Sequence, residues 1–204
     1  NIQRLGHWLS YSQGSEFSEK EWENLKVATV PNFQNKLFVG IKYGVDGKYV
    51  AMSIATKVDE KIFVESIDCQ SVRNGNTWII SFLKEADIEK VVIDGSGSQQ
   101  ILSDEIKDYG IKLKPVLPKV SDVVVANNMF EQAVTSSKNI CHNDQPSLKQ
   151  IVTNCKRRAI GTNGGFGFKA MMEEHEIALL DSVILAHWAC ATYKGVKKKQ
   201  KISC

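Results

Sequence analysis

The chain has 204 residues, of which 43% are hydrophobic and 24% charged, and this balance excludes a disordered or fibrous protein. Its length suits one well-buried domain with an appendage, or two small domains. The formal net charge of +3 makes the chain only mildly basic, although lysines crowd residues 194–204. A solvated terminus accounts for such a tail without any binding partner.

Cysteine usage and hydropathy indicate a protein that works inside the cell. The five cysteines form no C-x-x-C pair, so neither a zinc site nor a complete disulfide framework is expected. No charged-then-apolar leader opens the chain, and no run approaches 18 apolar residues. We therefore expect a reduced compartment and no membrane segment. Because the chain begins at Asn1 rather than at Met, we also expect it to be a domain of a larger protein.

Strand-like alternation begins after a polar segment, residues 1–34, which is typical of a linker or docking segment. Short turns join the first three predicted strands and force antiparallel neighbours. Asp46-Gly47 is the first turn, because Asp-Gly between two apolar runs is a strong hairpin signal. The same Asp46 is a candidate active-site carboxylate, and the pattern leaves both interpretations open. The predicted strands are residues 36–43, 48–57 and 61–68.

Helices and single strands alternate in the rest of the chain. Gly110 is expected to end one helix in a left-handed conformation, Ser121 to cap the next, and Pro115 to place its strand at a sheet edge. The predicted elements are a helix after Thr77, a strand at 91–94, a helix at 98–110, a strand at 113–117, helices at about 121–137 and 146–157, a hairpin at 157–171 around Asn163-Gly164, and a helix at about 174–193. This order predicts an α/β fold in which a three-stranded antiparallel meander and parallel strands form one mixed sheet flanked by helices, as in the ribonuclease H-like fold.

Asp94 ends a short apolar run, VVID, that fits a buried parallel strand. Ligands of open α/β sheets bind at the carboxyl ends of strands, which makes Asp94 a candidate site residue. Alternatively, Asp94 caps the following helix, although Ser96 or Ser98 would also serve there.

Asp181 interrupts an apolar helix face formed by Ile177, Ile184, Leu185 and Trp188. A carboxylate on such a face points toward the sheet, where an unpaired charge costs several kcal/mol. Asp181 therefore needs a cation, which is either an Arg or Lys in a core ion pair or a metal ion.

Three acids meet at one rim if strand 36–43 lies parallel to strand 91–94. Asp46 and Asp94 then share that rim, and Asp181 reaches it from the packing helix. Clustered carboxylates repel one another unless divalent ions bridge them, and two such ions clamp both oxygens of a phosphodiester displacement. Glu65 is a possible fourth acid, with an ordinary outward-facing residue as the simpler interpretation.

Four segments occur in the order and at the spacing of one family: FVGIKYGVDGKYVAMSIA, VVIDGSGS, CHNDQPSL followed by the Arg157–Lys169 hairpin, and LLDSVILAHWA. The chain resembles the C-terminal nuclease domain of the large terminase subunit of tailed phages or prophages. LGHWLS and WENL resemble the segment that joins the ATPase domain to that nuclease. The resemblance implies a linker at 1–34, a ribonuclease H-like nuclease domain at 35–193 and a basic tail at 194–204.

The resemblance also implies a Mg²⁺- or Mn²⁺-dependent endonuclease, with two ions, that cuts concatemeric viral double-stranded DNA during packaging. Its partners would be the terminase small subunit and the portal, and its location the host cytoplasm. The family's acids fall on Asp94 and Asp181, whereas the first acid of many members falls on Lys42. Asp46, just beyond that strand, is therefore the third predicted catalytic and metal-binding residue.

Basic residues supply the predicted DNA contacts. Arg157, Arg158 and Lys169 lie on the arms of the predicted hairpin, from which they would grip phosphates without reading bases. Lys42 would act beside the acids, and His142 is a candidate for DNA binding or proton transfer, with a role in leading into the next helix as the alternative.

Two other functions fit the same sequence. A Holliday-junction resolvase or recombinase can use the same fold, since fold does not determine function. A non-catalytic module that binds DNA or the portal is favoured by Lys42, which stands where an acid is expected. No Walker motif is present in the sequence, so any ATP-driven step belongs elsewhere.

Overall fold

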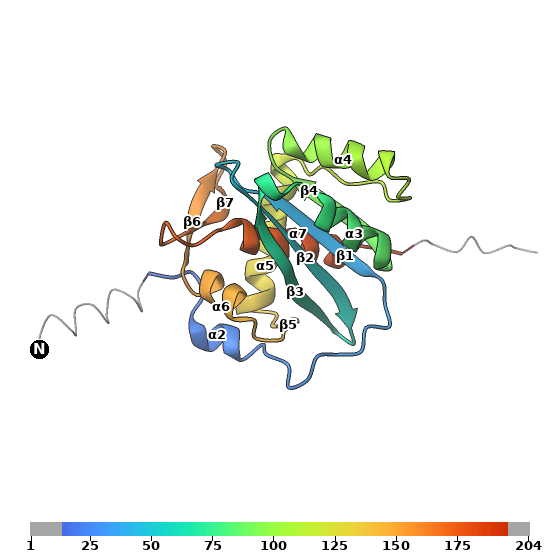
Figure 1. Ribbon diagram of the computed structural model, residues 1–204. Coiled ribbons are helices and arrows are strands. Elements are labelled where there is room, and N and C mark those ends of the chain that lie inside the picture. Colours follow the sequence, from blue (N-terminus) through green and yellow to red (C-terminus); the bar gives the residue numbers. More distant parts are fainter. Residues whose placement is uncertain (1–13, 196–204) are drawn as a thin grey trace, which may run out of the picture.

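A mixed five-stranded sheet forms the centre of the computed structural model, which describes residues 14–195 (Figure 1). β1, β2 and β3 form the predicted antiparallel meander, while β4 pairs parallel to β1 and β5 parallel to β3. The strands, in spatial order, are β4 (Ile88–Asp94), β1 (Leu37–Tyr43), β2 (Tyr49–Val58), β3 (Lys61–Ser71) and β5 (Ile140–His142). The α/β fold predicted from the sequence is confirmed.

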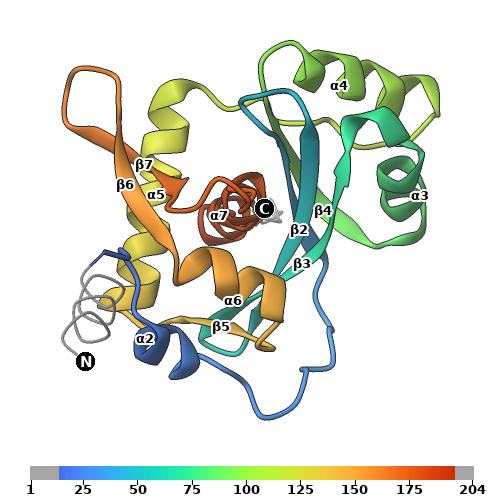
Figure 2. The same ribbon diagram turned by 60° about the vertical axis from the view of Figure 1, so that its left-hand side comes forward.

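Helices cover both faces of the sheet, because the central strands carry apolar residues on both faces. Figure 2 shows α7 (Ala178–Ala191) end-on between the sheet and α5 (Val120–Thr135), with α3 (Thr77–Glu85) and α4 (Ser98–Asp108) on the opposite face. Val39 and Ile41 of β1 pack in the cluster under α3 and α4, whereas Phe38 packs in the cluster that contains α7. Lys42 has the parity of Phe38 and therefore faces α7.

The segment at 113–117 is not the predicted edge strand. Val116 makes one isolated parallel bridge with Val92, through hydrogen bonds from Val116 N–H to Val91 O and from Ile93 N–H to Val116 O. Pro115 has no N–H to extend the pairing. The actual edge strand on the other side, β5, was not predicted because its three residues are too short for a periodic signal.

Two helix boundaries also differ from the prediction. α5 begins at Val120 with Lys119 as the N-cap residue, whose N–H donates to Asp122 Oδ2 at 2.9 Å, so Ser121 is not the cap. α6 (Pro146–Val152) is shorter than expected, because Cys155 already starts a strand. Gly110 has φ +70° after α4, as predicted.

The predicted hairpin is formed by β6 (Cys155–Ile160) and β7 (Gly165–Ala170), which make a separate two-stranded sheet. In the described part of the chain, no helix is long and apolar enough to cross a membrane.

Residues 14–34 pack on the domain rather than standing apart from it. α2 (Glu19–Glu23) begins with a capping box of Ser18 and Glu21, and buries Trp22 completely. Phe17, also fully buried, packs against Phe130 and Phe168. Residues 1–13 and the tail from 196 lie outside the described residues, so the predicted linker and tail boundaries stay predictions.

Candidate active site

Gly40 brings the helix that carries Asp181 into contact with the sheet. A Cβ at Gly40 would lie 2.1 Å from Ser182 O and 2.5 Å from Ala186 N, both backbone atoms of α7. Only glycine permits this approach. Ser53 Oγ and Ser182 Oγ lie 2.7 Å apart beside it, and because Ser182 Oγ donates to Leu179 O, Ser53 donates to Ser182. The contact places Asp181 close to the carboxyl end of β1.

Lys42 and Asp94 form an ion pair at this end of the sheet. They are partners in the parallel β1–β4 register, so their side chains share the face covered by α7. Lys42 Nζ donates to Asp94 Oδ2 at 2.6 Å, and the two side chains are only 12% and 20% exposed. No side chain caps α4, so the alternative role of Asp94 as a helix cap is excluded.

Asp181 faces this ion pair from the first turn of α7. Burial raises the pKa of Asp181 to about 6, the positive charges of Lys42 and Arg158 oppose that rise, and the negative charges of Asp94 and Glu176 add to it. No cationic group of a described residue lies within ion-pair distance of its carboxylate, so the simple core ion pair is not formed. Asp181 is therefore a carboxylate that lacks a direct partner among the described residues.

A small pocket unites these groups. Its volume is about 20 Å³, and its lining combines opposite charges with apolar side chains of α5 and α7. The lining residues are Lys42, Asp94, Val123, Asn127, Arg158, Asp181, Ile184 and Leu185. Two carboxylates, one ammonium and one guanidinium thus share one cavity.

Asn127 contributes an oxygen that the sequence did not reveal. The side chain is 2% exposed, and its Nδ2 donates to Val123 O at 2.8 Å. This leaves Oδ1 buried without a hydrogen-bond partner. Asn127 lies on the buried face of α5, three residues before Phe130 and seven before Val134. A polar residue at helical spacing among apolar ones is the signal that identified Asp181, and the same signal would have identified Asn127.

Asp46 is not among the residues that line this pocket, although the sequence predicted a site of three carboxylates. Its side chain is exposed in the β1–β2 turn, where Oδ1 accepts a hydrogen bond from Lys48 N–H at 3.0 Å. β1 ends at Tyr43, so the hairpin carries Asp46 past the end of β4. Among residues 14–195, no three His, Cys, Asp or Glu side chains are grouped closely enough to hold a metal ion. Asp46 is a turn former.

His142 is not placed to contact DNA, contrary to the prediction. It is fully buried in β5, where its ring stacks on Trp22 with centroids 3.9 Å apart. Its Nε2 lies 2.7 Å from Trp22 O, and Nδ1 accepts from Asp144 N–H, so the ring is neutral with a proton on Nε2. Burial lowers its pKa. Glu65, the possible fourth acid, accepts from Asn143 instead of joining the pocket.

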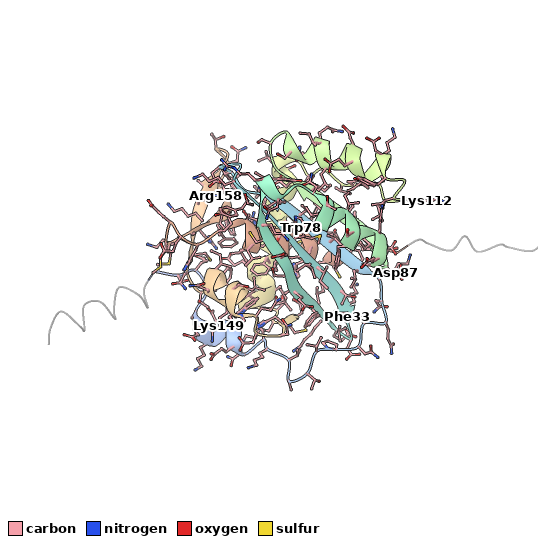
Figure 3. All side chains as sticks on the ribbon, viewed as in Figure 1. Phe33, Trp78, Asp87, Lys112, Lys149 and Arg158 are labelled. Carbon is pink, nitrogen blue, oxygen red and sulfur yellow. The ribbon has the colours of Figure 1, made fainter. Side chains whose placement is uncertain are left out.

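The hairpin residues divide into two groups. Arg157 is neutralised by Glu131 and by Glu16, 2.9 Å away, and its guanidinium lies 4.0 Å from the Phe166 ring centroid. Arg158, on the opposite face, donates to Phe168 O and lines the pocket; Figure 3 shows it on the hairpin.

An exposed lysine pair lies on the Arg158 face of the hairpin. Lys156 and Lys169 are directly opposite each other in the β6–β7 register. Lys156 is two residues from Arg158 along β6, so all three side chains share one face. The sequence interpretation named Lys169 but did not assign Lys156 to the site.

The donor set fits a hard divalent cation. Mg²⁺ takes oxygen ligands, commonly one or two carboxylates with water and phosphate oxygens. Asp181 lacks a direct partner among the described residues, and the same cavity is lined by Asn127, whose Oδ1 is buried without a hydrogen-bond partner there. Asp94 and Asp181 are therefore the carboxylates that would hold the ion.

No protein-family model matches this sequence, and no curated protein matches it either. Solved structures do match. The HK97 bacteriophage large terminase superposes with a TM-score of 0.63 at 13% identity, over 85% of this chain and 43% of that chain. The large terminase nuclease of thermophilic phage G20c with bound magnesium gives 0.60 at 14% identity, over 86% and 97%. The same nuclease with bound cobalt gives 0.58 at 13% identity, over 86% and 97%.

This chain thus spans less than half of the HK97 protein but nearly all of the G20c nuclease. At these identities the likeness concerns the fold. The chain has the ribonuclease H-like fold of the nuclease domains of phage large terminases.

Proposed function

We propose that this domain is a metal-dependent endonuclease that hydrolyses phosphodiester bonds of double-stranded DNA. The observation that carries the proposal is Asp181, a carboxylate without a direct partner in residues 14–195, in a pocket with Asp94, Lys42 and Arg158. Two structures of the G20c nuclease, which shares this fold, hold magnesium and cobalt. Mg²⁺ or Mn²⁺ is the expected ion here.

The chain's own residues divide the work between them. Asp94 and Asp181 would hold the cation, which supplies an activated water and neutralises charge on the phosphate. Lys42 and Arg158 lie beside them and would stabilise the negative charge that grows on the phosphoryl oxygens as water adds and the sugar oxygen leaves. Two ions, as the sequence predicted, would have to share the two carboxylates that line the described pocket.

The basic face of the hairpin would guide the DNA backbone toward the pocket. Lys156 and Lys169 are exposed and lead along one face to Arg158. Lysines that contact phosphates provide affinity without sequence preference. Arg157, already paired with two glutamates, is structural in this scheme.

In the cell, the proposed role is to cut concatemeric viral DNA during genome packaging. The HK97 match is a large terminase of which this chain covers less than half, so an ATPase part would be supplied outside this domain. The terminase small subunit and the portal are the proposed partners, and the host cytoplasm the proposed location. A junction resolvase on the same fold remains an alternative nuclease.

A non-catalytic DNA-binding module is the second candidate, because one observation favours it. Lys42 forms a short ion pair with Asp94. A positively charged side chain thus stands at the position where an acidic metal ligand is expected in many large terminases. Such a site would bind DNA through the hairpin without cutting it.

Plasmid nicking separates the two candidates. Purified protein is incubated with supercoiled plasmid in Mn²⁺, in Mg²⁺ and in EDTA, alongside Asp94→Asn and Asp181→Asn. A nuclease nicks only with metal, and each variant loses about 100-fold or more of the rate. Gel-shift binding without nicking in any metal would favour the non-catalytic module, and equal nicking by all three proteins would reject this pocket.

A further inference from the structure

We propose that the pocket binds a single divalent cation through Asp94, Asp181 and Oδ1 of Asn127, and that Lys42 supplies the second positive charge in place of a second ion. This inference rests on the proposed function for its biological meaning, but it concerns metal binding and can be tested without any DNA. Three independent features of the pocket support it.

The first feature is the orientation of the Asn127 amide. Nδ2 donates to Val123 O at 2.8 Å. The reverse orientation would place two carbonyl oxygens against each other, so the bond determines which way the amide points. Oδ1 is consequently buried with no donor to bind among the described residues, in a side chain that lines the pocket and is only 2% exposed. A buried acceptor left unsatisfied costs about 1–3 kcal/mol, and a bound cation or its water would remove that cost.

The second feature is the size of the cavity. Its volume of about 20 Å³ exceeds the ~10–15 Å³ that one water-sized sphere needs, but does not accommodate two. Two bridged ions lie about 3.5–4 Å apart and each carries further water or phosphate oxygens. The pocket is open on one side, so the space between these side chains suits one ion whose remaining ligands lie outside it.

The third feature is charge. Asp94 and Asp181 contribute two negative charges, and Lys42, 2.6 Å from Asp94, already balances one of them. Of the two carboxylates that line the pocket, only Asp181 lacks a direct partner, and Arg158 adds a further positive charge. Glu176 adds a third negative charge that acts on Asp181, so these groups together carry three negative and two positive charges. One divalent ion would leave a net charge of about +1, and a second would leave about +3, which disfavours its binding.

The close packing around Asn127 indicates why its amide keeps this position. A Cβ at Gly167 of β7 would meet Ile160 Cδ1 at 2.8 Å and Asn127 Nδ2 at 3.5 Å. The glycine thus lets the hairpin approach α5 at the level of this side chain. Arg158 is the cross-strand partner of Gly167, so the same approach brings the guanidinium to the pocket.

The test counts bound ions. Free Mn²⁺ is measured by electron paramagnetic resonance during titration of the whole chain, with Asn127→Ala, Asn127→Asp, Lys42→Asp and, as a control outside the pocket, Asp46→Asn. We expect one ion per wild-type chain, a Kd raised about 10–100-fold by Asn127→Ala, and no change for Asp46→Asn. Asn127→Asp keeps an oxygen at the same place and should retain or tighten binding, which keeps the test informative if Asn127→Ala does not fold. Lys42→Asp should raise the count to two.

Several results would overturn the inference: two ions or none on the wild type, or an unchanged Kd for a folded Asn127→Ala protein. Failure of the proposed function is distinguishable from these outcomes. A chain that binds one ion through Asn127 and never nicks DNA would retain the inference and lose the nuclease. A chain that needs Asp94 and Asp181 to nick DNA, but whose affinity for Mn²⁺ does not depend on Asn127, would retain the nuclease and lose the inference.

Discussion

At the scale of single residues, the same chemical group has different roles according to its surroundings. Asp46 and Asp181 are both aspartates in segments that the sequence singled out. Asp46 is exposed in a turn, and its carboxylate accepts a hydrogen bond from the Lys48 N–H. Burial raises the pKa of Asp181 to about 6, and its carboxylate has no direct partner among the described residues. Buried, incompletely satisfied groups mark functional positions more reliably than acids as such.

Two buried histidines make stability depend on pH. Burial lowers the pKa of His187 to about 4, and it lowers the pKa of His142 as well. The unfolded chain, with histidine pKa values near 6.5, then binds more protons than the folded one below that pH. The stability that these two histidines contribute is therefore complete above about pH 6.5 and is lost as the pH falls toward the folded values, whereas the raised pKa of Asp181 acts in the opposite direction.

We expect His187→Leu to flatten this dependence. Between pH 7 and 5, His187 alone should remove about 2 kcal/mol from the free energy of unfolding. Urea denaturation of wild type and variant at both pH values measures the difference. A wild-type protein that loses no more stability than the variant between these pH values would contradict the burial argument.

At the scale of elements, the site depends on how α7 meets β1. The two backbones touch at Gly40, two residues before Lys42, while Asp181 lies next to Ser182 of the same contact. The geometry of the pocket is thus set by a glycine that contributes no functional group. A second glycine, Gly167, lets the hairpin approach α5 closely in the same way.

Gly40→Ala should destabilise the domain strongly. Its Cβ would meet two backbone atoms of α7, which cannot rotate away, so we expect a loss of about 3 kcal/mol or more in the free energy of unfolding. Gly110→Ala is the matched control: nothing lies within 4 Å of its Cβ, and only its φ of +70° opposes the change, at about 1 kcal/mol. Equal losses in thermal or urea denaturation would show that the contact with α7 is unimportant.

The Lys156–Lys169 pair predicts opposite effects on stability and on binding. Like charges directly across a strand pair destabilise it, so Lys156→Gln should slightly raise the free energy of unfolding. The same change should weaken DNA binding and reduce the slope of log K against log salt by about 1. Fluorescence anisotropy with a labelled duplex at several salt concentrations measures this. An unchanged slope would remove the hairpin face from the DNA path.

At the scale of the whole molecule, periodicity sufficed for the fold and for locating the two acids that share the pocket. The meander, the parallel strand before Asp94 and the apolar helix around Asp181 each have a local signature. β5 does not, because three residues show no period, and so the burial of His142 was missed. Asp46 lies outside that pocket, and the sequence could not show this because a turn aspartate and a metal ligand look alike in one dimension.

The part of the site that the sequence left out depends on tertiary contacts. Asn127 enters the pocket only because α5 packs beside α7, and Lys156 matters only because Lys169 lies opposite it. Residues 14–34 were predicted as a linker, but they bury Phe17 and Trp22 in the core. No local pattern in that polar segment indicates this burial.

The central claim is that the pocket of Asp94 and Asp181, without Asp46, carries out DNA cleavage. The most direct measurement is the rate of supercoiled-plasmid nicking in Mn²⁺ by the Asp181→Asn and Asp46→Asn proteins, each checked for folding by circular dichroism. We predict a loss of about 100-fold or more for Asp181→Asn and a rate within about threefold of wild type for Asp46→Asn. Loss of nicking in Asp46→Asn to the level of Asp181→Asn would contradict the account and restore the three-carboxylate site.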